Sequence, residues 1–253
     1  MNNYRSFQRS YVEQLSEIDR MDASMRLSYQ NALNALFFSV NARYSHRRDN
    51  QTYGYDYRGA TSVVQAVDRS TTSDDYGIGF DGSKGFDLWM ASVRMFCNYS
   101  GSTGEELIGG TVFPYRSHTV GVGAGGTVTP LPWFNIVFSS GYGWSMSHTD
   151  EQTYSSRTVR SATQRLTMNF YVTRQLTIGA SIEDKYNNLS ETDRHAWFGN
   201  VSAKFKLGRV DLELQANNLF DQRQYTRVSH SGLDIYSQTS QLRPRNILGT
   251  VRF

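Results

Sequence analysis

The sequence predicts an all-β fold, an antiparallel transmembrane β-barrel sheet of about eleven or twelve meander strands with short periplasmic turns and long extracellular loops. Three observations predict it. Apolar and polar residues alternate with a period of two along most of the chain, which is the pattern of a strand. Several alternating segments run to about ten residues, whereas strands of soluble proteins typically have about five or six. The connections between segments alternate between tight and long, as in outer-membrane barrels.

The composition excludes several other classes of protein. Hydrophobic residues make up 38% of the 253 residues and aromatic residues 13%, which is too apolar for a disordered chain. Continuous apolar runs such as residues 35–38 are far shorter than the about 20 residues of a transmembrane helix. The single Cys97 rules out an internal disulfide framework and a cysteine-based zinc site. A net charge of +3 is too small to suggest nucleic acid as a partner.

Residues 1–20 contain no basic stretch followed by an apolar core, so no secretory signal is expected in them. Phe7, Tyr11, Leu15 and Ile18 have helical spacing, which leaves a short amphipathic helix and an irregular loop as alternatives. We divide the chain into residues 1–20, an N-terminal loop or the remnant of a preceding strand, and residues 21–253, the barrel portion.

From Asp22 onward each segment has one mainly apolar face and one mainly polar face. In chain order, the apolar faces read Ala23, Met25, Leu27, Tyr29; Leu36, Phe38, Val40, Ala42, Tyr44; Trp89, Ala91, Val93, Met95, Cys97, Tyr99; Phe134, Ile136, Phe138, Ser140, Tyr142, Trp144; Leu166, Met168, Phe170, Val172; Leu176, Ile178, Ala180, Ile182; Trp197, Val201, Ala203, Phe205, Leu207; Val210, Leu212, Leu214, Ala216; and Ile247, Gly249, Val251, Phe253.

A soluble sandwich or a small barrel with a dry core gives the same alternation. The connections argue against both. The tight ones are expected at residues 30–33, 81–86, 129–132, 173–176 and 207–210, and the long ones around residues 48–60, 101–116, 147–157, 186–195 and 222–235.

Aromatic residues also bracket the apolar faces. Phe134 and Trp144, and likewise Trp89 and Tyr99, lie ten residues apart, which is about 25 Å along a tilted strand and equals the height of a lipid-facing band.

Charged residues of these segments fall on the polar face. They are Arg26, Arg43, Arg94, Lys204, Asp211 and Glu213. A lipid-facing Arg or Lys at the bilayer midplane costs about 2–4 kcal/mol, so this sorting is a physical requirement in lipid. The polar face is therefore expected to line a hydrated lumen.

Counting back from Phe253 gives about eleven strands, which would place the N-terminus on the extracellular side. Complete bacterial barrels have an even number of strands, and an open sheet edge does not occur in hydrocarbon. We therefore expect the C-terminal part of a longer barrel. The alternative is that residues 4–18 make a twelfth strand and the chain closes alone.

The end of the chain resembles that of TonB-dependent receptors. The residues that carry the resemblance are Leu212-Glu213-Leu214-Gln215-Ala216-Asn217-Asn218-Leu219-Phe220-Asp221, then Tyr225, and the closing stretch from Leu242 to Phe253. The residue pattern of the strands and turns, including Tyr29-Gln30-Asn31, looks most like that of receptors of the Bacteroidota. The resemblance implies a bacterial outer-membrane protein for nutrient uptake, assembled by the barrel-assembly machinery through the strand ending at Phe253. It also implies a link to the TonB system, although only through a plug-containing N-terminal part that is not seen in this sequence.

No pattern indicates catalysis or a bound cofactor. The five histidines, His46, His118, His148, His195 and His230, are interpreted as solvated residues near strand ends or loops. His148 with Asp150, and Asp193 with His195, come nearest to ligand pairs, but two ligands do not make a metal site. An outer-membrane lipase is the enzymatic alternative, and the adjacent Ser229 and His230 do not fit it because neighbours in a strand face opposite ways.

The glycines Gly121, Gly123, Gly125 and Gly126 precede a strand end rather than a helix, so they are not a phosphate-binding loop and instead leave room beside bulky neighbours or allow curvature.

The loops are rich in Tyr and Arg, as at Tyr53, Tyr55, Tyr57, Arg58, Tyr115, Arg116, Tyr225 and Arg227. These side chains suit a sugar, siderophore or peptide, or the phosphates of outer-leaflet lipopolysaccharide, and ordinary polar loops remain the alternative. Besides the receptor-like barrel, two further functions stay open: a self-contained barrel acting as a porin or adhesin, and a soluble β-rich binding domain.

Overall fold

A computed structural model describes residues 7–9, 15–58, 61–108, 111–149, 157–189, 194–231 and 234–253. Within these ranges the chain is almost wholly β-structure, and its one helical element is the short 3-10 turn η1 (Leu88–Met90). No helix in these ranges is both long enough and apolar enough to cross a membrane.

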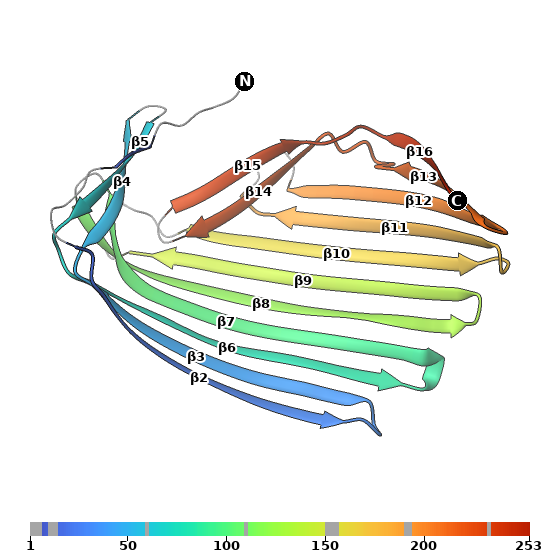
Figure 1. Cartoon of the computed structure of the whole chain (residues 1–253), viewed down its shortest axis with the longest axis horizontal. Helices are drawn as coiled ribbons and strands as arrows, with labels where there is room; N and C mark the ends of the chain where they lie inside the picture. Colours follow the sequence, from blue (N-terminus) through green and yellow to red (C-terminus); the bar gives the residue numbers. More distant parts are fainter. Residues whose placement is uncertain are drawn as a thin grey trace.

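Eleven strands form one antiparallel meander sheet, as the sequence predicts. They are β2 (Ile18–Asn31), β3 (Leu36–Asp49), β6 (Thr71–Phe86), β7 (Ala91–Ile108), β8 (Thr111–Leu131), β9 (Phe134–His148), β10 (Arg157–Tyr171), β11 (Leu176–Asn187), β12 (His195–Leu207), β13 (Val210–Asn217) and β16 (Asn246–Arg252). Figure 1 shows a curved, open wall in which β2 and β16 are the two edges. Tight connections lie at one end of the wall, the turn end, and the longer ones at the other, the loop end, where only β7 and β8 among the strands of the wall are joined by a short connection.

Two hairpins and one short strand lie outside the meander. β4 (Thr52–Arg58) and β5 (Thr61–Val67) are inserted between β3 and β6, and β14 (Gln224–Ser231) and β15 (Asp234–Gln241) between β13 and β16. β1 (Phe7–Arg9) pairs in parallel with β5. The helix considered for residues 1–20 is therefore wrong where the structure describes them, because Phe7 lies in β1 and Ile18 already begins β2.

Two predicted connections are corrected. Residues 101–116 are not a long loop but the facing ends of β7 and β8, which are 18 and 21 residues long. Polar residues stand on both faces of these strand ends, so the sequence pattern there resembles that of a loop. Residues 81–86 belong to β6, and the turn is Asp87–Met90 instead. Trp89 lies in that turn with φ 56°, so the expected pairing of Trp89 and Tyr99 on one strand face is wrong.

The wall has almost no buried core. The buried hydrophobic residues among those described are Leu107, Val159, Ala196 and Val228, while side chains as large as Met25, Trp197 and Leu214 stay exposed. No second layer covers the eleven-stranded sheet in the described ranges, so the soluble sandwich does not describe this fold.

Candidate functional site

The two faces of the wall are continuous across the strands. Cα partners in antiparallel strands share a face, so the register carries each face from strand to strand. One line of partners across β2, β3, β6, β7, β8 and β9 reads Leu27, Val40, Phe80, Cys97, Val122 and Tyr142. The adjacent line reads Arg26, Asn41, Gly79, Asn98, Gly121 and Gly143. The predicted apolar and polar faces are thus single surfaces, which we call the apolar face and the polar face.

The six predicted polar-face charges lie on that face, and several are neutralised in pairs. Arg94 and Asp81 approach to 2.7 Å, Lys204 and Glu213 to 3.3 Å, and Arg252 reaches the same Glu213 at 3.7 Å. Such pairs keep the polar face hydrophilic with little net charge.

Aromatic side chains lie toward both ends of the apolar face. At the turn end, the rings of Phe134 and Phe170 stack with centroids 4.7 Å apart. Toward the loop end, the Tyr99 hydroxyl is hydrogen-bonded to His118 Nδ1 at 2.9 Å. Trp144 lies ten residues beyond Phe134 on β9. The bracket predicted on β9 is present.

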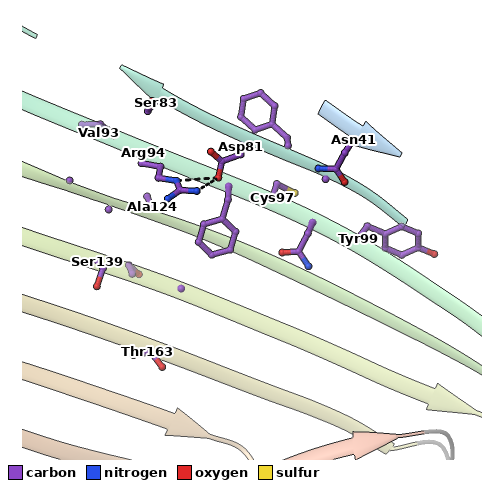
Figure 2. A pocket seen from close by; sticks show the side chains of 18 of the residues that line it. Asn41, Asp81, Ser83, Val93, Arg94, Cys97, Tyr99, Ala124, Ser139 and Thr163 are labelled. Atoms are coloured by element: carbon purple, nitrogen blue, oxygen red, sulfur yellow. Dashed lines mark hydrogen bonds and ion pairs between the residues drawn. The ribbon is translucent and has the colours of Figure 1, made fainter. Parts of the chain in front are cut away.

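A hollow of about 940 Å³ lies against the middle of the wall, lined largely by polar-face residues of β3 and β6–β10 (Figure 2). The Asp81–Arg94 pair, Asn41 and Thr163 are among its lining residues. Its side chains offer donors and acceptors to a hydrated solute or a polar surface.

Glycines of β8 leave space for two side chains that line this hollow, those of Phe96 and Asn98. A Cβ on Gly121 would come within 2.5 Å of Asn98 Oδ1, and one on Gly123 within 2.4 Å of the Phe96 ring. The interpretation that these glycines leave room for bulky neighbours is confirmed. They allow side chains of β7 to lie flat across β8, which keeps the wall thin here.

His46 and His195 lie near the ends of β3 and β12, as predicted, whereas His118 lies well within β8. All three are on the apolar face toward the loop end. His46 Nδ1 contacts Asp74 Oδ1 at 2.8 Å, and His195 Nδ1 contacts Asp184 Oδ2 at 3.0 Å. The available signal was sequence parity: His46 shares that of Tyr44 on β3, His118 that of Val120 on β8 and His195 that of Trp197 on β12.

Neither predicted ligand pair lies wholly within the described residues. Asp150 and Asp193 lie outside the described residues, as do the side chains of Ser229 and His230. Across the described ranges no three His, Cys, Asp or Glu side chains cluster as metal ligands.

The tyrosines and arginines predicted in loops do not gather into one site within the described residues. The side chains of Tyr53, Tyr55, Tyr57 and Arg58 fall outside them. Tyr115 and Arg116 are consecutive in β8 and so face opposite ways. Tyr225, on β14, lies over the polar face, where Lys185 Nζ sits 5.2 Å from its ring and 5.6 Å from the ring of Phe198.

The Asn-Leu-Phe-Asp run, residues 218–221, lies at the base of the β14–β15 hairpin and makes hydrogen bonds there. Asn218 Nδ2 donates to the carbonyls of Gln222 and Arg243, both at 2.9 Å. Asp221 Oδ1 accepts a hydrogen bond from the Arg245 backbone N–H at 3.0 Å. This hydrogen bond, together with one from the Arg223 guanidinium, holds the pKa of Asp221 below its usual range. The run therefore fastens the two chains that enter and leave the hairpin.

Searches by family model and among curated proteins find no match for this chain. Solved structures do match. The siderophore receptor PirA from Pseudomonas aeruginosa aligns with a TM-score of 0.55 and 9% identity over 84% of this chain and 34% of the receptor. PirA from Acinetobacter baumannii aligns with a TM-score of 0.52 and 11% identity over 84% of this chain and 34% of that receptor. The ferric enterobactin receptor PfeA from Pseudomonas aeruginosa aligns with a TM-score of 0.52 and 11% identity over 83% of this chain and 36% of that receptor.

These likenesses establish the fold alone, that of part of a β-barrel wall. The chain spans about a third of the length of the receptors it matches.

Proposed function

We propose that this chain is the C-terminal β-barrel part of a TonB-dependent receptor-like protein that takes up a nutrient across the bacterial outer membrane. The observation that carries the proposal is the apolar face, unbroken across eleven strands, backed by a polar face with a hollow. The fold of the solved siderophore receptors and the resemblance of the residues from Leu212 to Phe253 support it. Its role is that of a wall, with lipid on one side and hydrated polar groups on the other, and not of an enzyme.

The two edges of the wall support the view that further strands complete it. β2 and β16 are the first and eleventh strands of an antiparallel meander, so they run in the same direction. A second copy of the wall would meet them in parallel, whereas an odd number of additional strands would meet both antiparallel. Each unpaired N–H or C=O in hydrocarbon costs several kcal/mol, so these edges need partners.

Two partners follow from the proposal. β16 is an edge strand and Phe253 is 98% exposed, so the closing strand is accessible to the barrel-assembly machinery. The TonB system would act through the plug-containing part implied by the resemblance, and not through this wall.

Uptake by cells that carry or lack the intact gene tests the proposal. The gene product should fractionate with the outer membrane, and uptake of labelled ferric siderophores or another scarce nutrient should require it and stop when a protonophore removes the inner-membrane gradient. Protonophore-insensitive permeation of small solutes would favour the porin alternative. Recovery of the product in the water-soluble fraction would contradict both.

A further inference from the structure

Three arginines lie on the apolar face, where arginine is costly at the midplane of a bilayer. Arg48 on β3, Arg116 on β8 and Arg160 on β10 have the same parity as the apolar residues of their strands, and all three are exposed. Arg160 is the Cα partner of Trp144, and Arg48 follows Tyr44 by four residues. The arginines therefore stand at or just beyond the aromatic residues toward the loop end.

Their heights along the wall agree. Arg48 lies 12 residues from Leu36, Arg116 lies 15 from Leu131 and Arg160 lies 11 from Tyr171, where each reference residue ends its strand at the turn end. At ~2.5 Å of axial rise per residue, these separations are about 28–38 Å. All three arginines thus clear the ~25 Å apolar band of an outer-membrane barrel and reach the level of lipid headgroups.

Among the described residues, the acids near these arginines are engaged by other side chains. Asp74 is engaged by Tyr44 and His46, Glu105 by Arg69 at 3.6 Å, and Asp184 by His195. Asp19 is the Cα partner of Arg48, but Arg48 Nε donates a hydrogen bond to Ser70 Oγ at 3.3 Å.

We propose that Arg48, Arg116 and Arg160 form a phosphate-binding belt for the anionic glycolipid of the outer leaflet, lipopolysaccharide. The belt rests on the proposed function, because it requires the apolar face to contact lipid. Guanidinium groups bind phosphate through paired, charge-assisted hydrogen bonds, and a basic residue near an anionic lipid surface strengthens binding by roughly five-fold. The spread of the three arginines over six neighbouring strands suits several headgroups around the wall rather than one pocket.

The test measures binding of bisphosphorylated lipid A to the intact protein purified from outer membranes in a neutral detergent. The variant Arg48→Gln/Arg116→Gln/Arg160→Gln is compared with Arg26→Gln/Arg43→Gln/Arg165→Gln, which removes the same charge from exposed arginines of the polar face. We expect affinity to fall by roughly thirty-fold or more in the first variant and by less than two-fold in the second. Dephosphorylated lipid A should bind both variants and the wild type equally weakly.

Three outcomes would overturn the belt. They are equal losses in the two variants, no preference of the wild type for phosphorylated lipid A, and displacement of lipid A by millimolar inorganic phosphate, which would indicate a site for the free anion. A wild-type protein absent from the outer-membrane fraction would overturn the proposed function together with the belt, whereas a membrane-inserted protein without phosphate preference would overturn the belt alone.

Discussion

Replacing Phe138 by arginine should prevent stable insertion of the wall, because Phe138 lies on the apolar face four residues above the turn end of β9. At ~2.5 Å per residue it stands about 10 Å into a ~25 Å band, close to the midplane. An arginine there costs about 2–4 kcal/mol, which is roughly 30- to 900-fold in the folding equilibrium. Typical domains have only about 5–15 kcal/mol in total.

The neighbouring Ser139 provides the control. It lies at the same depth on the same strand, but it is on the polar face and lines the hollow. Ser139→Arg adds the same charge to a hydrated surface, so it should cost less than about 1 kcal/mol.

The assay is the amount of trypsin-resistant protein in the outer-membrane fraction of cells that express each variant of the intact gene. Phe138→Arg should accumulate at a few per cent of the wild-type level or less, and Ser139→Arg near that level. Equal accumulation of the two variants would refute the assignment of the faces.

Three further predictions follow from local geometry. Gly123→Val should destabilise the sheet by about 1–3 kcal/mol, because its Cβ would meet the Phe96 ring at 2.4 Å. Gly141→Val should not destabilise it, because a Cβ there has no neighbour within 4 Å. Urea titrations of both variants in micelles measure the difference. The pKa of Asp221 is lowered in the folded chain, so its stabilisation of the hairpin base is present above the unfolded pKa of about 3.9 and is lost as pH falls through the folded pKa. Protease cleavage of the β14–β15 hairpin should therefore rise below about pH 4, and Asp221→Asn should remove that pH dependence. Lys185→Met should loosen the same hairpin by about 0.5–1 kcal/mol through loss of its two ring contacts, and faster amide exchange confined to β14 and β15 would show it.

The alternation of residues was enough to predict most strands of the wall, and it failed where both faces carry polar residues. Val120, Val122 and Ala124 follow the alternation, but Thr103 and Arg116, farther along the same pair of strands, are polar residues at apolar-face positions. Asp81 reads as a turn residue in sequence, yet it lies within a strand because Arg94 across the ladder neutralises it.

The candidate site was predicted only in its general character. The polar face was foreseen from parity, but the hollow depends on which glycines of β8 oppose Asn98 and Phe96, and that register is a long-range property. The contacts of the histidines could not be predicted, because partners such as Asp74 lie 28 residues away in the sequence from His46.

The most direct test of the whole account uses the single cysteine, Cys97, which is exposed on the apolar face of β7. A nitroxide attached there, in the intact protein reconstituted in lipid, should collide often with oxygen and rarely with a water-soluble nickel chelate. Moved one residue along, in Cys97→Ser/Asn98→Cys, it should show the reverse preference. Higher nickel accessibility at position 97 than at position 98 would contradict the account.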